Sequence, residues 1–102
     1  MHAIIEQHRE ELASLCRRFH VRRLEVFGSA ATSRFDPKTS DVDFLVTFGE
    51  VRAGEYADNY FDLLEALEAL FERPVDVVVA STIRNPYFLQ GIQPTRTLVY
   101  AA

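Results

Sequence analysis

Hydrophobic residues recur along this chain with two different periods, and the change between the periods predicts where helices and strands alternate. Apolar positions from Ile4 onward are spaced three or four residues apart, which predicts one amphipathic helix ending near Arg18 or Phe19. Shorter apolar runs with the two-residue alternation of strands follow it. The predicted strands cover residues 21–27, 41–48, 75–80 and 97–100, the last of them at a sheet edge.

Besides a short helix that begins at Gly28-Ser29, two further helices are predicted between these strands. The longer one can be capped by Asp58 or Asn59, and it stops before Pro74, which cannot continue a helix. Its expected buried stripe consists of Phe61, Leu64, Leu67, Leu70 and Phe71. The shorter helix covers residues 83–92 and carries Pro86 in its first turn, where proline is tolerated.

The first predicted strand has two unlike faces. Leu24 and Val26 share an apolar face with the aliphatic stem of Arg22, and alternation places the remaining positions on the opposite face. Those remaining positions are Val21, Arg23, Glu25 and Phe27. Helices and strands therefore alternate along the whole chain, which predicts an α/β (α+β) fold with helices packed on a small mixed sheet.

The length and composition of the chain restrict its class. A chain of 102 residues predicts a single domain spanning residues 1–102, and a hydrophobic content of 48% is typical of a globular protein. No apolar run approaches the roughly 20 residues needed to cross a bilayer. The charged N-terminal segment is unlike a signal peptide. We therefore expect a cytoplasmic protein, in which the single cysteine, Cys16, is a small buried core residue.

The formal net charge of −4 argues against a nucleic-acid partner, since nucleic-acid-binding domains usually carry a basic surface. One local exception is a group of four arginines around the end of the first helix. The group comprises Arg17, Arg18, Arg22 and Arg23. It is either a solvated helix end, where cations suit the helix dipole, or a docking patch for an acidic partner or for phosphates.

Three aspartates interrupt the predicted strands in a way that suggests metal chemistry. Asp41 and Asp43 are two positions apart at the start of one strand, so their side chains share a face, and Asp76 lies inside a valine run. Neighbouring carboxylates repel each other unless a cation lies between them, and Mg²⁺ prefers such oxygen ligands, often together with a phosphate. The sequence therefore predicts metal-assisted phosphoryl or nucleotidyl chemistry, against the alternative of acids that are merely solvated at strand ends.

The segment Gly28-Ser29 follows the first strand and precedes the acid pair. Glycine lets a phosphate approach the backbone, and Ser29 offers a hydroxyl and the amides of a helix start. An ordinary strand-to-helix turn is the alternative, and only the position ahead of the acids favours phosphate binding. Arg34 and Lys38 in the following loop are either phosphate ligands or plain surface charges.

Taken together, Gly28-Ser29, Ser40-Asp41-Val-Asp43-Phe-Leu-Val46 and Val75-Asp76-Val77 resemble the motifs of the minimal nucleotidyltransferases of the polymerase-beta-like superfamily. The resemblance covers nearly the whole chain. It departs from the commonest form of the family in the loop, where Ser33 stands in place of a frequent glycine and Arg34 follows it.

The resemblance implies a mechanism. Asp41 and Asp43 would bind two Mg²⁺ ions that hold the triphosphate of ATP, and Asp76 would share one metal ion and act as general base. Gly28 and Ser29, with Arg34, would hold the nucleotide. Members of this family are often antitoxins that transfer AMP to a tyrosine hydroxyl of a HEPN-type toxin and form a complex with it. The resemblance therefore implies such a partner here.

Two other functions stay open on the sequence alone. One is a binding module without catalysis, which retains the acids for Mg–nucleotide binding and neutralises its partner by occlusion. The other is a nucleotidyltransferase with a different acceptor, such as a nucleic-acid end or a small alcohol. The acidic net charge argues mildly against the nucleic acid.

Overall fold

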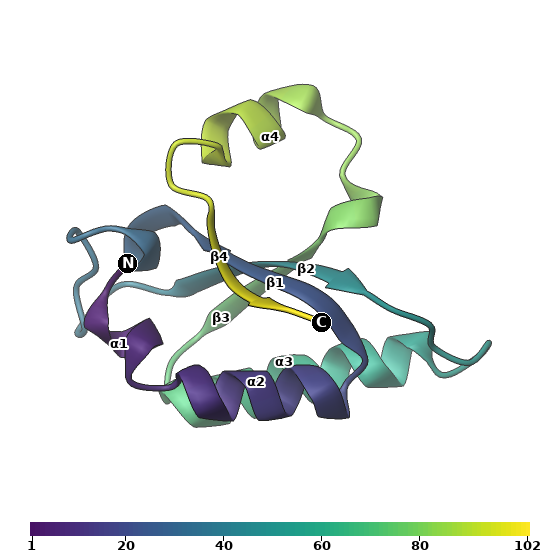
Figure 1. Ribbon diagram of the computed structural model, residues 1–102. Helices are drawn as coiled ribbons and strands as arrows, with labels where there is room; N and C mark the ends of the chain where they lie inside the picture. The colour runs from purple at the N-terminus through teal and green to yellow at the C-terminus, as the bar shows by residue number, and fades with distance from the viewer.

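The computed structural model describes residues 1–102 as a four-stranded sheet with helices on both sides (Figure 1). The strands are β1 (Val21–Phe27), β2 (Val42–Phe48), β3 (Val75–Val79) and β4 (Thr97–Ala101). The helices are α1 (Ala3–Glu6), α2 (Arg9–Arg18), α3 (Tyr56–Phe71) and α4 (Pro86–Ile92). Two short 3₁₀ turns, η1 (Gly28–Ala31) and η2 (Ala80–Thr82), follow β1 and β3.

The strand order is β3-β2-β1-β4, with β2 and β3 parallel and the other pairs antiparallel. Helices α2 and α3 cover one face of this sheet, while α4 lies over the opposite face (Figure 1). The predicted mixed sheet and the predicted edge strand are confirmed. No helix of the structure combines the length and the apolar composition that crossing a membrane requires.

The predicted first helix is broken into α1 and α2, so the expectation of one continuous helix is wrong. His8 separates them, with φ −112° and ψ 17° outside the helical region. Its Nδ1 lies 2.8 Å from the carbonyl oxygen of Ile4. Its ring packs on Phe71 at a centroid distance of 5.1 Å. A side chain that bonds the preceding turn and packs inward thus offers the backbone an alternative to helix continuation.

The main core lies between the sheet and helices α2 and α3. In α3, Leu63 is fully buried and Phe61 is 61% exposed, which corrects the predicted stripe. The helix begins at Tyr56, earlier than predicted, and its rotation is set by a 2.8 Å hydrogen bond from the Tyr60 hydroxyl to the carbonyl of Val77. Cys16 is buried as expected, and burial raises the pKa of its thiol to about 12.

Strand β1 does not alternate strictly along its length. A β-bulge between Val21 and Arg23 shifts the register against β2, so Val21 joins Leu24 and Val26 in the main core. The prediction that Val21 shares a face with Glu25 is therefore wrong. An extra residue in one strand reverses the alternation beyond it, and a single sequence carries no signal for such an insertion.

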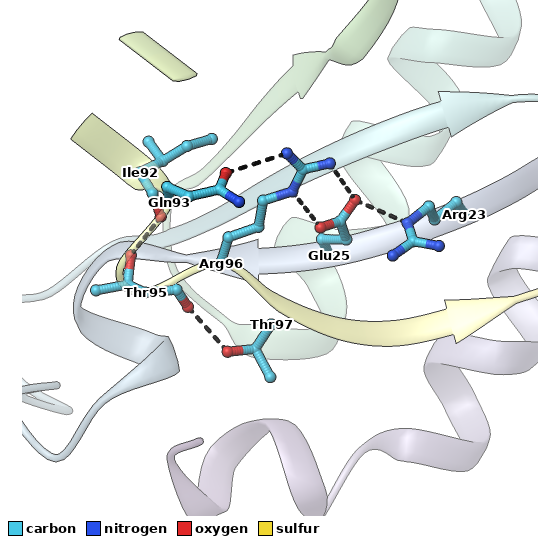
Figure 2. Close-up of polar contacts among 7 residues, drawn as sticks. All are labelled: Arg23, Glu25, Ile92, Gln93, Thr95, Arg96 and Thr97. Atoms are coloured by element: carbon cyan, nitrogen blue, oxygen red, sulfur yellow. Dashed lines mark hydrogen bonds and ion pairs between the residues drawn. The ribbon is translucent and has the colours of Figure 1, made fainter. Parts of the chain in front are cut away.

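The face of the sheet opposite the main core is largely polar. Its apolar part is a small cluster of Phe27, Leu45 and Ile92. Glu25 lies beside this cluster and is only 4% exposed. Arg96 binds both of its carboxylate oxygens, and Arg23 donates from Nε to Oε1 over 2.9 Å (Figure 2). Two guanidinium groups thus compensate one buried carboxylate, as burial of a charge requires.

We expect Arg96→Met to lower the free energy of unfolding by about 2 kcal/mol, because Glu25 then stays buried with a single partner. Urea unfolding measures this change. Arg84→Met is the matched control, since the exposed Arg84 guanidinium donates only to backbone carbonyls. Equal losses in the two variants would contradict a special role for the Glu25 ion pair.

The same variant carries a pH signature. In the wild-type protein, the hydrogen bond that Glu25 accepts from Arg96, together with the one from Arg23, holds the pKa of the Glu25 carboxyl below its ordinary value. This stabilisation is therefore present above the ordinary glutamate pKa and is lost as the pH falls through the lowered folded-state pKa. As the pH falls through this range, we expect the free energy of unfolding to decrease less in Arg96→Met than in the wild-type protein.

Candidate functional site

Two of the predicted acids lie side by side on the polar face of the sheet. Strands β2 and β3 are parallel neighbours, and Asp43 is the direct partner of Asp76 in their register. Neighbouring strands are about 4.8 Å apart, and partner residues project from the same face. Asp43 is half-buried, whereas Asp76 is exposed. The backbone itself therefore sets the spacing of this carboxylate pair.

The third acid, Asp41, lies just outside β2, one residue before the strand begins, and is exposed. It is nevertheless close enough to influence Asp43. Burial is the main cause that raises the pKa of the Asp43 carboxyl, and the charges of Asp76 and Asp41 raise this pKa further. The three side chains do not form one group with the spacing of a metal site, so the structure brings together the pair but not the whole set.

None of the three acids has a basic partner in the protein. The ion pairs of the structure involve only Glu6 and Glu25, with three arginines. The carboxylates of Asp43 and Asp76 thus repel each other with no cation from the chain between them. Such a donor set fits a hard divalent cation such as Mg²⁺, which binds carboxylate oxygen and brings phosphate or water as further ligands.

Gly28 and Ser29 lie next to this pair, at the end of β1. Gly28 has φ +72°, and a Cβ atom added there would be 2.6 Å from Oδ2 of Asp43. Glycine is therefore required twice, once by the backbone and once by the carboxylate. The following η1 turn is held by Thr32, whose amide and hydroxyl both donate to the carbonyl of Ser29.

The structure places Arg34 on the exposed side of the loop that joins η1 to β2. Its backbone amide donates to Oγ1 of Thr32 over 3.1 Å, and its guanidinium has no partner in the protein. Lys38 is also exposed, in a turn that Asp36 closes by accepting from the Lys38 amide. Both cations are thus solvated and free to meet a ligand, and neither contacts the acids.

A hollow of about 290 Å³ lies farther along β3. Val78, on the same face as Asp76, borders it together with η2 and α4. The other lining residues are Thr82, Ile83, Arg84, Asn85 and Phe88. Larger hollows, of about 430, 400 and 340 Å³, lie between α2 and α3 or at the end of α2, and none of them is lined by Asp41, Asp43 or Asp76.

Two groups of residues next to the site escaped the sequence reasoning. Thr95 accepts a 3.0 Å hydrogen bond from the amide of Gly28. Nothing in the sequence distinguishes this threonine from others, because threonines are common in loops. The Glu25–Arg96 pair did have a signal in the sequence. A glutamate inside an apolar strand needs a partner when it is buried, although the sequence does not say which arginine supplies it.

The chain belongs to the family of the nucleotidyltransferase domain, whose family model matches residues 5–98. It is 36% identical over 100 residues to the protein adenylyltransferase MntA of Thermococcus cleftensis, covering 96% of this chain and 89% of the relative. A solved structure described as a candidate minimal nucleotidyltransferase is 31% identical, with a TM-score of 0.72 and 94% coverage of both chains.

A more distant neighbour shares the fold. A chain from the solved complex of a tri-AMPylated HEPN toxin with an MNT antitoxin, from Shewanella oneidensis, superposes with a TM-score of 0.65 at 14% identity. It covers 96% of this chain and 73% of that one. The predicted resemblance to minimal nucleotidyltransferases and the predicted fold class are confirmed. The individual roles of the three acids, Gly28, Ser29 and Arg34 stay predictions.

Proposed function

We propose that this chain transfers AMP from Mg–ATP to a tyrosine hydroxyl of a HEPN-type toxin and thereby acts as its antitoxin in the cytoplasm, with residues 1–102 forming one catalytic domain. The observation that carries the chemistry is the in-register pair of Asp43 and Asp76 beside the Gly28 turn. The MntA relative and the AMPylated toxin complex support the acceptor and the partner.

The proposed roles follow from where each residue lies. Asp43 and Asp76 would hold Mg²⁺ as a pair, and Asp41, which lies just outside that pair, would complete the set of ligands for the two ions that the family resemblance implies. The ions would neutralise the charge of the triphosphate and polarise the α-phosphorus. Gly28 leaves the backbone open to the triphosphate, and Ser29 offers its hydroxyl there. The guanidinium of Arg34 has no partner in the protein, so it is available to bind the β- and γ-phosphates of ATP.

The transfer step balances without any further reactant. The acceptor oxygen forms a bond to the α-phosphorus, the bond from this phosphorus to the bridging oxygen breaks, and pyrophosphate leaves with the electron pair. The exposed carboxylate of Asp76 accepts the proton of the attacking hydroxyl and releases it to water. Asp43 is half-buried, lies against Gly28 and is paired in register with Asp76, so its proposed role is metal ligation rather than proton transfer.

The test is transfer of label from ATP labelled at the α-phosphate, with Mg²⁺, into the proteins of an extract of the native source. We expect one labelled protein with the wild-type chain and none with Asp41→Asn/Asp43→Asn. Mass spectrometry of that protein should show the mass of AMP on a tyrosine. Asp36→Asn serves as the matched control, because it removes an exposed acid from the same loop.

The outcomes separate the proposed function from the two alternatives. Label in nucleic acid or in a small molecule would show another acceptor. A double variant that still neutralises the toxin, with no labelled protein in either sample, would show that the chain acts by occlusion. Either result would overturn the proposed transfer to a protein.

A further inference from the structure

The connection between α4 and β4 contacts the proposed nucleotide site directly. Oγ1 of Thr95 accepts a hydrogen bond from the amide of Gly28 over 3.0 Å. The same hydroxyl donates its single hydrogen to the carbonyl of Ile92 over 3.2 Å (Figure 2). The direction of both bonds is therefore determined, because the hydrogen on Oγ1 is committed to Ile92 and its lone pair receives the Gly28 amide.

Thr95 is itself held firmly. Its amide and that of Arg96 both donate to the carbonyl of Ile92, over 3.1 and 2.9 Å. Ile92 is buried against Phe27, immediately before Gly28. Two nitrogens of the Arg96 guanidinium donate to the buried carboxylate of Glu25 in β1 (Figure 2). The turn is thus fastened to β1 on both sides of the hydroxyl, which makes Thr95 a fixed point rather than a mobile loop residue.

What Thr95 holds is the most constrained peptide of the site. Gly28 has a positive φ, and its Cα lies against the Asp43 carboxylate with no room for a Cβ atom. A displacement of this peptide would move the start of the phosphate-facing turn and change the space around Oδ2 of Asp43. The Gly28 amide is already used by Thr95, so its contribution to the site is its position.

We propose that Thr95 is a positioning residue for nucleotide binding, which holds the Gly28 peptide and, through it, the space in front of Asp43. This inference rests on the proposed nucleotidyl transfer. It deepens that function by placing one determinant of Mg–ATP affinity on the last connection of the fold, outside the Gly-Ser and aspartate motifs. Thr95 itself does not touch the substrate.

The decisive variants are Thr95→Val, which keeps the shape and removes the hydroxyl, and Thr95→Ser, which keeps the hydroxyl. Loss of one hydrogen bond predicts an increase of about fivefold in KM and Kd for Mg–ATP in Thr95→Val, with kcat changed less than about twofold. Thr95→Ser should stay close to the wild type. Thr47→Val is the matched control, since the Thr47 hydroxyl makes no hydrogen bond and lies four positions beyond Asp43 in β2.

A measurement on the wild-type chain tests the contact without substitution or catalysis. By hydrogen exchange, the Gly28 amide should be protected far more than that of Gly54, a glycine in an exposed loop. Thr95→Val should remove the protection of Gly28, and Thr95→Ser should keep it.

Affinity for Mg–ATP is measured separately from AMP transfer, so the two proposals can fail independently. A chain that binds Mg–ATP without transferring AMP would overturn the proposed function, and the affinity of Thr95→Val would still decide the role of Thr95. Affinities of Thr95→Val equal to those of Thr47→Val, or equal losses in Thr95→Val and Thr95→Ser, would overturn the positioning role. A Gly28 amide that exchanges as fast as Gly54 would do the same.

Discussion

Asp43→Asn should reduce AMP transfer by at least about a thousandfold while the chain stays folded. The carboxylate of Asp43 lies at the centre of the site, partnered in register by Asp76 and contacted by Gly28. An amide has nearly the same shape but lacks the negative charge that binds Mg²⁺. Label transfer measures the activity, and circular dichroism confirms the fold. Activity within about tenfold of the wild type would exclude Asp43 as a metal ligand.

The same variant should remove a pH-dependent step in stability. Burial and the neighbouring acids raise the folded-state pKa of Asp43 above its unfolded value. The folded chain then binds this proton more tightly, so without Mg²⁺ its stability falls as the pH rises from the ordinary aspartate pKa through the raised one. Thermal unfolding at several pH values in a chelator should show this fall in the wild type and not in Asp43→Asn.

Magnesium should offset that penalty. Because a ligand that binds only the folded state stabilises it by mass action, added Mg²⁺ should raise the melting temperature of the wild type. It should leave Asp43→Asn nearly unchanged. The exposed Asp62 of α3 supplies a control, since Asp62→Asn should keep both the pH step and the response to Mg²⁺. Identical pH profiles of wild type and Asp43→Asn would contradict the predicted repulsion.

Gly28→Ala should lower transfer at least about a hundredfold and also destabilise the chain. A Cβ atom at this position would come within 2.6 Å of Oδ2 of Asp43, so the carboxylate has to move. The positive φ of 72° adds backbone strain of about 1–2 kcal/mol for any residue with a Cβ. Mg–ATP affinity, transfer rate and melting temperature should all decrease.

Gly54→Ala separates the two causes. Gly54 has a similar φ of +86°, but a Cβ atom there would meet nothing within 4 Å. This variant should therefore lose a comparable amount of stability from the backbone alone and keep its full activity. If Gly54→Ala and Gly28→Ala were equally active, the approach of Gly28 to Asp43 would have no part in the reaction.

Most of the fold follows from the hydrophobic pattern, because burial of an apolar face leaves a strand or helix little freedom. The positions of the four strands and the mixed sheet agree with the alternation and with the order of elements. The sequence pattern did not determine that the strands carrying Asp43 and Asp76 are parallel neighbours. The interruption at His8 was not predictable from the pattern. It depends on where one imidazole finds partners in the fold, namely the carbonyl of Ile4 and the ring of Phe71.

Other misses have the same physical origin. Phe61 is as apolar as Leu63, so only the rotation of α3, set by contacts such as the Tyr60 hydroxyl to β3, decides which of them is buried. The bulge in β1 is likewise a tertiary feature. In the site, local motifs were enough to predict Gly28, Asp43 and Asp76. The hydrogen bond that holds the Gly28 amide comes from Thr95, which is 67 residues away in the chain, so no local motif indicates it.

That separation has a consequence for the order in which the protein becomes functional during synthesis. The hairpin of β1 and β2 and the crossover to β3 contain all the proposed ligands, yet the Gly28 peptide is fastened only when residues 92–101 have been made and have docked. A contact between residues so far apart in the chain costs more loop-closure entropy than a local one, so it forms late in folding. A nascent chain would therefore carry its acids well before it holds nucleotide tightly, and ATP affinity would report completed folding.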